Sequence, residues 1–309
     1  RARIRVDSIR GDTRRADGQW DFVLREHPRI GYIRLNSFGD HTVEDLQRAL
    51  QSLQGRMDGL VMDLRGNAGG LLNAAVDVCD MFIPADQWIV STRGRDPAQF
   101  EDSLATHPPL VKPDLPVALI VDRFSASASE IVAACLQDYG RAEIIGERTW
   151  GKGTVQNVLE IEGGRSAIRL TTQTYWRPSG SNIHRHRDAT EEDEWGVKPA
   201  PQYAASLTAE QYRELFEQRR QRDIPLTAQE PSASDTSDAE ESSSTETFLD
   251  PQLQKAIDYL QQQMPSRPPF SQATGPVDSA VFPVDRTPER IQVPTDHDDR
   301  KRSLSVARS

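Results

Sequence analysis

Three serines stand at the junction between a predicted strand and a predicted helix. Ser125, Ser127 and Ser129 follow the apolar run 116–121 and precede a segment whose apolar residues recur at helical spacing. Open α/β sheets place their chemistry where strands end and helices begin, and a helix N-terminus favours developing negative charge. A serine hydroxyl becomes a nucleophile when a base removes its proton. We therefore predict that Ser127 is a nucleophile.

A lysine flanked by glycines is the candidate base. Lys152 lies between Gly151 and Gly153, in a loop whose backbone can approach other groups closely. A lysine accepts a proton only if its pKa falls well below the reference value of about 10.4, and burial has that effect. Because Trp150 stands nearby, we expect Lys152 to be drawn into an apolar pocket, where it deprotonates Ser127.

Attack on a carbonyl also requires hydrogen-bond donors for the oxyanion that forms. The backbone N–H of Ala128, directly after the predicted nucleophile, is one candidate. A second could come from the Gly69–Gly70 turn, because glycines lack side chains that would keep the amide away from a substrate.

Each of these motifs also has an ordinary structural interpretation. Residues 127–130 read S-x-x-E, so Ser127 could simply cap the helix. Residues 151–153 could form a tight turn with a solvated lysine, and residues 67–70 could be a common turn between strand and helix. Each motif is weak alone, and the ordered combination carries the prediction.

Two other kinds of enzyme site compete with this hypothesis. Residues 146–152 match G-x-x-x-x-G-K, the start of a phosphate-binding loop, but Gly153 replaces the required Ser or Thr. Residues 154–158 then alternate as a strand does, whereas that motif requires a helix. A histidine triad is the other option, but none of the six histidines sits in a recognisable catalytic motif. His184 and His186 lie in a polar loop, where we expect them to be solvated.

Strand and helix patterns alternate through the first two thirds of the chain, which predicts a parallel sheet with helical crossovers. Thr42 and Asp45 form a capping-box-like start for the first helix, a second helix is expected over 71–82, and Gly140 ends a third. The predicted strands are 29–38, 59–64, 116–121 and 142–146, with weaker signals at Ile4–Val6 and Trp20–Leu24. Later segments predict a β-hairpin (154–162 and 166–176), a polar loop (184–194) and a short charged helix (209–219).

The composition of the chain limits which other kinds of protein it could be. The net charge of −10 argues against a nucleic-acid partner. No apolar run reaches the roughly 18 residues of a membrane span, no signal peptide is present, and a start at Arg1 indicates a fragment or processed product.

No Cys/His cluster has metal-ligand spacing. Cys79 and Cys135 fall on apolar faces of predicted helices, so we expect buried thiols; a disulfide is the less favoured alternative.

The last third of the chain has a different character. Residues 227–247 have neither apolar periodicity nor bulk and are predicted to be disordered. Residues 248–264 could form one amphipathic helix, with Leu253, Ile257 and Leu260 in line. The Pro-rich and then charged segment from Pro265 onward is again predicted to be disordered.

These motifs together resemble the C-terminal processing peptidases, also called tail-specific proteases. The matching segments stand in the family's order and cover roughly residues 29–199: GYIRLNSF, GLVMDLRGNAGGLL, SASASEIVAACLQDYGRA and IIGERTWGKGTVQ. The resemblance implies a serine–lysine dyad of Ser127 and Lys152, with Gln156 orienting the lysine through its amide. It assigns the oxyanion amides to Gly70 and Ala128. It implies no metal and no organic cofactor.

The resemblance also implies an architecture and a setting. The fold would be α/β with a crotonase-like (ClpP/crotonase-type) core, followed by the hairpin region and a largely disordered tail. Residues 1–28 would be a connector from an upstream PDZ domain, 29–205 the catalytic domain, 206–226 a helical extension and 227–309 the tail. Family members work in the periplasm or cell envelope on proteins with accessible C-termini. Any membrane association would use a segment outside this chain.

Two points qualify the resemblance. The family runs from a glycine equivalent to Gly180 to a G-I-x-P-D ending, whereas this chain inserts residues 184–194 and ends Gly196-Val-Lys-Pro-Ala200. We expect this insertion to be solvated and without a role. A non-catalytic peptide-binding or scaffolding protein, in which Ser127 is only a cap, is the alternative function.

Overall fold

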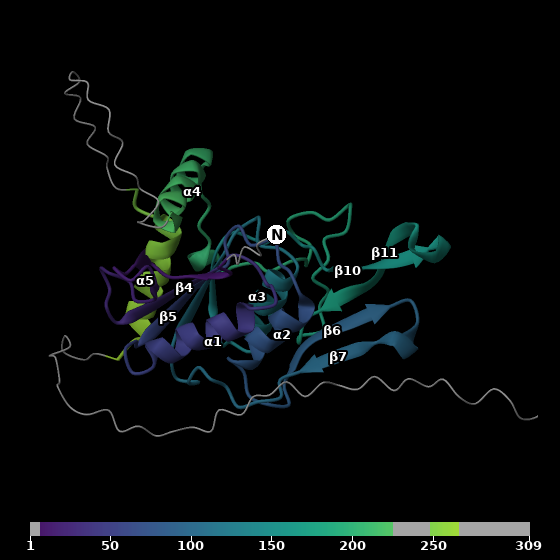
Figure 1. Cartoon of the computed structure of the whole chain (residues 1–309), viewed down its shortest axis with the longest axis horizontal. Helices are drawn as coiled ribbons and strands as arrows, with labels where there is room; N and C mark the ends of the chain where they lie inside the picture. Colours follow the sequence, from purple (N-terminus) through teal and green to yellow (C-terminus); the bar gives the residue numbers. More distant parts are fainter. Residues whose placement is uncertain (1–6, 225–247, 266–309) are drawn as a thin grey trace, which may run out of the picture. The chain divides into compact units, whose positions relative to one another are not determined.

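A five-stranded sheet with strand order β1-β4-β5-β8-β9 forms the centre of the fold (Figure 1). This computed structural model describes residues 7–224 and 248–265. Strands β4, β5, β8 and β9 pair in parallel, and the short β1 pairs antiparallel with β4. The strand bounds are Ile9–Arg10 (β1), Ile30–Leu35 (β4), Gly59–Asp63 (β5), Val117–Val121 (β8) and Glu143–Gly146 (β9). The predicted alternation of parallel strands and helices is confirmed.

Helices cover both faces of this sheet. Successive side chains of a strand point to opposite faces, so Leu60 and Met62 pack with α1, α2 and α3, while Val61 packs with α5. A strand buried on both faces reads as a continuous apolar run, which is why β5 and β8 were evident in the sequence. The helices are Thr42–Leu53 (α1), Leu72–Asp80 (α2), Ala128–Asp138 (α3), Ala209–Asp223 (α4) and Pro251–Gln263 (α5).

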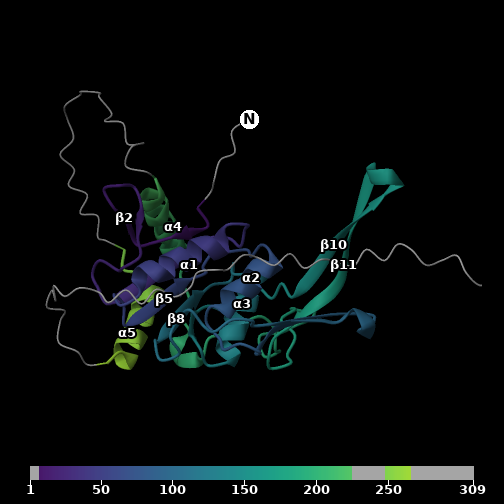
Figure 2. The same cartoon turned by 60° about the horizontal axis from the view of Figure 1, so that its bottom comes forward.

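A second sheet, of order β10-β11-β6-β7, extends from the core (Figure 2). The predicted hairpin is confirmed as β10 (Thr154–Ile161) and β11 (Ser166–Trp176). The other two strands, β6 (Trp88–Gly94) and β7 (Glu101–Leu104), were not predicted. Because β11 pairs with β6 only over residues 173–176, the outer part of the hairpin projects beyond its neighbours.

Some expectations for the ends of elements need correction. Thr42 does not cap α1: the N-cap is His41, and the Thr42 hydroxyl instead accepts from the Gly39 N–H and donates to the Ser37 carbonyl. Near the N-terminus, Trp20–Asp21 (β3) pairs with Thr13–Arg14 (β2), so the strand is shorter than predicted. The predicted helix at 248–264 is confirmed as α5. The predicted strand at Ile4–Val6 and the predicted disorder over 227–247 and after 265 lie outside the described residues.

Both cysteines are free and buried, as predicted. Burial raises the pKa of the Cys79 thiol, helped by its contact with Cys135. Both residues therefore serve as small apolar side chains in the contact between α2 and α3. None of the helices in the described ranges combines the length and apolar character that a membrane crossing requires.

The packing of α5 on the sheet gives a stability prediction. Leu260 is fully buried against this face, so Leu260→Ala should lower the free energy of unfolding by about 2–5 kcal/mol. Chemical denaturation of the chain measures this loss. Leu249→Ala is the matched control, because Leu249 is 71% exposed and should change stability little. Equal effects of the two substitutions would contradict the packing of α5 described above.

Candidate active site

The serine turn (residues 125–129) links the end of β8 to the start of α3. Ser127 is the N-cap of α3 and has φ 58° and ψ −115°, a conformation that L-residues rarely adopt. The hydroxyl of Ser125 donates to the Leu64 carbonyl at 2.9 Å, and that of Ser129 to the Asn67 carbonyl at 2.8 Å. The two flanking serines therefore hold the turn in place, while Ser127 is half-buried at its apex.

The glycine loop (residues 65–70), which follows β5, packs directly against the serine turn. The Ala126 N–H donates to the Asn67 carbonyl at 3.0 Å, and the Asn67 amide donates to the Leu35 carbonyl at 3.0 Å. Gly70 has φ 154°, and a Cβ there would collide with the Phe38 carbonyl, so only glycine fits. The N–H groups of Gly70 and Ala128 make no hydrogen bond within the described part of the chain.

The lysine loop (residues 147–153), which follows β9, lies beside the serine turn. The Trp150 N–H donates to the Ser125 carbonyl at 3.0 Å. The N–H groups of Ser127 and Lys152 donate to the same oxygen, Oε2 of Glu130, at 2.9 and 2.7 Å. The backbones of the two predicted dyad residues are thus attached to one carboxylate.

The expected apolar pocket around Lys152 is absent from this arrangement. Lys152 is exposed, and the Trp150 side chain is 58% exposed, so neither is enclosed by other residues. The glycines on either side instead allow the backbone of this loop to approach that of a neighbouring segment. A Cβ on Gly153, for example, would collide with the His184 N–H group. The loop was therefore predicted correctly as a close approach of backbones, but burial of its lysine was wrong.

Gln156 lies farther along β10. A β-bulge falls between Val155 and Gln156, and the Gln156 side chain is exposed. It forms no side-chain hydrogen bond with Lys152 or with any other residue that the structure describes. Its role as a partner of the lysine therefore stays a prediction.

The structure excludes a phosphate-binding loop at residues 146–152. Residues 154–161 form strand β10, where that motif requires a helix. Moreover, the N–H groups of Gly151 and Lys152 donate to the Glu130 carboxylate, at 2.6 and 2.7 Å. The loop amides that would have to surround a phosphate are already used.

The histidines within residues 7–224 form no hydrogen-bonded triad with Ser127. His107 does pair with a carboxylate, through 2.6 Å between its Nδ1 and Oδ2 of Asp80. Asp80, however, is the last residue of α2, whereas the glycine loop precedes the first turn of that helix. The pair therefore lies at the end of α2 remote from Ser127. His186 is exposed, as expected, whereas His184 is half-buried, and this burial together with the neighbouring His186 lowers the pKa of His184.

The insertion 184–194 is mostly exposed, as expected, but residues at its two ends contact the lysine loop. The Arg185 N–H donates to the Gly151 carbonyl at 2.9 Å. Trp195 is buried, and the guanidinium carbons of Arg148 and Arg185 lie over its ring, 3.5 and 4.3 Å from the centroid. A tryptophan within a strongly charged stretch was the one sequence signal that could have indicated this packing.

A buried ion cluster, which was not predicted, supports the glycine loop from the other face of the sheet. The carboxylate of Asp63 bonds the guanidinium groups of Arg65 and Arg219 and accepts from the Tyr32 hydroxyl at 2.8 Å. Burial alone would raise the pKa of Asp63, but Arg219 and Arg65 outweigh it and hold that pKa well below its usual range. Arg65 also binds Asp250, at the start of α5.

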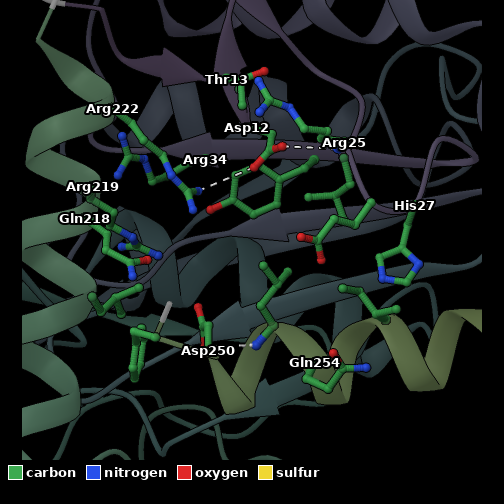
Figure 3. Close-up of a pocket in the computed structure, with 18 of the residues that line it drawn as sticks. Asp12, Thr13, Arg25, His27, Arg34, Gln218, Arg219, Arg222, Asp250 and Gln254 are labelled. Carbon is green, nitrogen blue, oxygen red and sulfur yellow. Dashed lines mark hydrogen bonds and ion pairs between the residues drawn. The ribbon is translucent and has the colours of Figure 1, made fainter. Parts of the chain in front are cut away.

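This ion cluster borders a cavity of about 610 Å³ between α4, α5 and the sheet (Figure 3). Arg34, Arg219, Arg222 and Asp250 are among the residues that line it. Ser127 and Lys152 are not, so the cavity is separate from the serine turn. Among the residues that the structure describes, no group of His, Cys, Asp and Glu side chains is placed to hold a metal ion.

Comparison with known proteins gives the family. A strand–turn–helix with a strained serine, beside a glycine loop with free amides, is typical of α/β enzymes that use a serine nucleophile. The model of peptidase family S41 matches residues 29–199, and the chain belongs to that family. The resemblance to C-terminal processing peptidases is thereby confirmed.

Individual relatives agree with this assignment. The carboxy-terminal-processing protease of Bartonella bacilliformis is 43% identical over 162 residues, which are 50% of this chain and 36% of that protein. A carboxy-terminal processing protease of Bacillus subtilis is 38% identical over 159 residues, 50% of this chain and 32% of that one. Among solved structures, a photosystem II D1 C-terminal processing protease aligns with TM-score 0.52 and 28% identity, over 66% of this chain and 49% of that one. The chain spans about a third of the length of these curated relatives.

The buried ion cluster gives a second stability prediction. Asp63→Asn removes the charge that Arg65 and Arg219 share; Arg65 keeps Asp250 as a counter-ion, but the buried Arg219 loses the carboxylate that it pairs with. The free energy of unfolding should fall by about 3–5 kcal/mol in chemical denaturation. Asp58→Asn is the control, because the Asp58–Arg29 pair is more exposed and worth at most about 1 kcal/mol. A loss below that of the control would contradict a supporting role for the cluster.

Proposed function

We propose that this chain is the catalytic part of a serine endopeptidase that cuts proteins near their C-termini. Ser127 is the nucleophile and Lys152 is the base. The observation that carries the proposal is the shared Glu130 oxygen, which holds the backbones of both residues beside the free amides of Gly70 and Ala128. Membership of a peptidase family supports the same reaction.

The proposed reaction has two halves. In the first, the Ser127 hydroxyl oxygen attacks the scissile carbonyl while Lys152 takes its proton, and the Gly70 and Ala128 N–H groups stabilise the oxyanion. The intermediate collapses, and the departing amine receives that proton from the lysine. In the second half, Lys152 takes a proton from a water molecule whose oxygen attacks the acyl ester. The ester bond to Ser127 then breaks, and the serine oxygen receives that proton from Lys152. Gln156 orients the lysine amine through its side-chain amide.

The exposure of Lys152 has a consequence for this scheme. A lysine must be neutral to accept a proton, and water stabilises its charged form. A polypeptide substrate lying across the serine turn would cover Lys152 and exclude that water. Substrate binding would therefore create the environment that the free chain does not provide.

The capping interpretation of Ser127 accounts for only part of the arrangement. Glu130 accepts from the Ser127 N–H, as in a capping box. A cap, however, does not require the left-handed backbone of Ser127, and it does not explain why the same carboxylate also binds Gly151 and Lys152. These observations favour the enzyme over a scaffolding protein.

The wider assignments belong to the same proposal. The core would be crotonase-like, with residues 1–28 as a connector from a PDZ domain, 29–205 as the catalytic domain, 206–226 as a helical extension and 227–309 as a tail. PDZ domains capture peptide C-termini by adding them as a strand, which suits cleavage near that end. A periplasmic or cell-envelope location is proposed from the family resemblance.

The dyad is tested by two substitutions. Ser127→Ala and Lys152→Ala should each abolish cleavage of an unstructured fluorogenic peptide with a free C-terminus, because each removes a group that takes part in bond formation or proton transfer. Ser127→Ala should also abolish labelling by a fluorophosphonate. Lys198→Ala, another exposed lysine, is the control and should retain activity. Cleavage at the parent rate by Ser127→Ala would exclude the proposed nucleophile.

The oxyanion site is tested at Gly70. Gly70→Ala forces the loop away from Phe38 and misplaces the Gly70 N–H, so kcat should fall by about 10²-fold or more. Gly55→Ala is the matched control, since Gly55 also has a positive φ but stands in open space. The measurement is kcat of each of the two variants, corrected for its folded fraction. A loss no larger than that of Gly55→Ala would contradict the role of this amide.

A further inference from the structure

One carboxylate receives four hydrogen bonds from the two loops of the candidate active site. Glu130 is fully buried, one turn into α3. Its Oε1 accepts from the Thr149 hydroxyl and the Gly151 N–H, each at 2.6 Å. Its Oε2 accepts from the N–H groups of Ser127 and Lys152, at 2.9 and 2.7 Å. One oxygen thus belongs to the lysine loop alone, and the other joins that loop to the serine turn.

The site around Glu130 fits an ionised carboxylate. Burial raises the pKa of Glu130, and hydrogen bonds from Thr149, Gly151, Ser127 and Lys152 offset this rise only in part, so the case for the ionised form rests on the geometry of the donors. Two carboxylate oxygens offer about four acceptor positions, and all four are used here by donors. A neutral side chain of the same shape, such as a protonated carboxyl or an amide, would instead point its own O–H or N–H groups at these donors.

We propose that Glu130 is a positioning residue that sets the distance between the nucleophile and the base. The inference rests on the proposed function of Ser127 and Lys152, and it assigns to Glu130 a part in the reaction rather than helix capping alone. The carboxylate touches neither substrate nor proton. It acts by fixing two backbone positions to a single oxygen atom.

The backbone of Ser127 explains why such an anchor is needed. Its left-handed conformation costs of the order of 1–3 kcal/mol and persists only where surrounding contacts enforce it. The bond from the Ser127 N–H to Glu130 is one such contact, and the bond from the Ala126 N–H to Asn67 is another. Without the first, Ser127 can relax and carry its hydroxyl away from Lys152.

The lysine loop depends on the same anchor. Thr149 donates to Glu130 and accepts from the Val197 N–H at 2.8 Å, so the carboxylate is connected to the segment behind the loop. Lys152 itself is exposed, and its backbone N–H is bonded to Glu130. Loss of the carboxylate would therefore change where the lysine side chain begins, although it would leave the side chain intact.

The test is Glu130→Gln in the full chain. The amide keeps the shape but presents an NH₂ group to two of the four donors. The rate of fluorophosphonate labelling of Ser127, and kcat for the fluorogenic peptide, should each fall by about 10²-fold, since a small misplacement of reacting groups costs that much. KM should change less than about twofold, because Glu130 does not touch the substrate. A general loss of fold would instead reduce the active fraction and leave KM and the labelling rate of the remaining protein unchanged.

Glu147→Gln is the matched control. Glu147 is also a nearly buried carboxylate of the lysine loop, but its partners are Arg123 and the Leu207 N–H rather than Ser127 or Lys152. The substitution should lower stability and leave the labelling rate of the folded protein close to that of the parent. Labelling by Glu130→Gln within twofold of the parent would overturn the proposal, as would equal losses in the two variants.

A second variant keeps the inference testable if Glu130→Gln does not fold. Glu130→Asp retains the charge but is one methylene shorter, so it cannot reach all four donors, and the labelling rate should fall at least tenfold. A folded Glu130→Asp with the parent rate would overturn the proposal. Ser127→Ala separates the two levels of inference. If it is unlabelled while the Glu130 variants react normally, only the positioning role fails; if it is still labelled, the proposed function fails.

Discussion

The parallel order of the central strands is the constraint on which the site depends. Because β5, β8 and β9 lie side by side and run in one direction, the loops that follow them emerge at the same edge of the sheet. Those loops carry the glycines, the serine turn and the lysine. Residues far apart in sequence thus meet without any long connection, and hydrogen bonds between the loops, such as that from Ala126 to Asn67, complete the arrangement.

Burial of charge stabilises these loops from both faces of the sheet. On the α3 face, Glu130 is surrounded by donors from the serine turn and the lysine loop. On the α5 face, Asp63 and Arg65 hold the beginning of the glycine loop. A buried ion is costly unless fully paired, so each cluster tolerates few other arrangements of its partners. Because any displacement would leave a buried charge unpaired, the two clusters fix the positions of the loops at this edge of the sheet.

The sequence predicted the parts of the site that are local in the chain. Each strand–turn–helix unit contains its own signals, namely an apolar run, small turn residues and a helical period, so the serine turn and the glycine loop were placed correctly. The strands β6 and β7 were missed; β7 is short, polar and mostly exposed, and gives little pattern. The exposure of Lys152 was also missed, since flanking glycines indicate only that the backbone is close to something.

Interactions between distant segments were beyond the reach of a single sequence. Arg219 sits in a helix whose charged composition suggests solvent exposure, yet its guanidinium reaches the fully buried Asp63. Nothing in the spacing of the two residues indicates this contact. In the sequence, Glu130 was noted only as the final residue of the S-x-x-E capping box, and helix capping is by itself a sufficient reason for a glutamate at that position. Its bonds to Gly151 and Lys152 depend on how β9 lies beside β8, so its second role becomes apparent only in the folded chain.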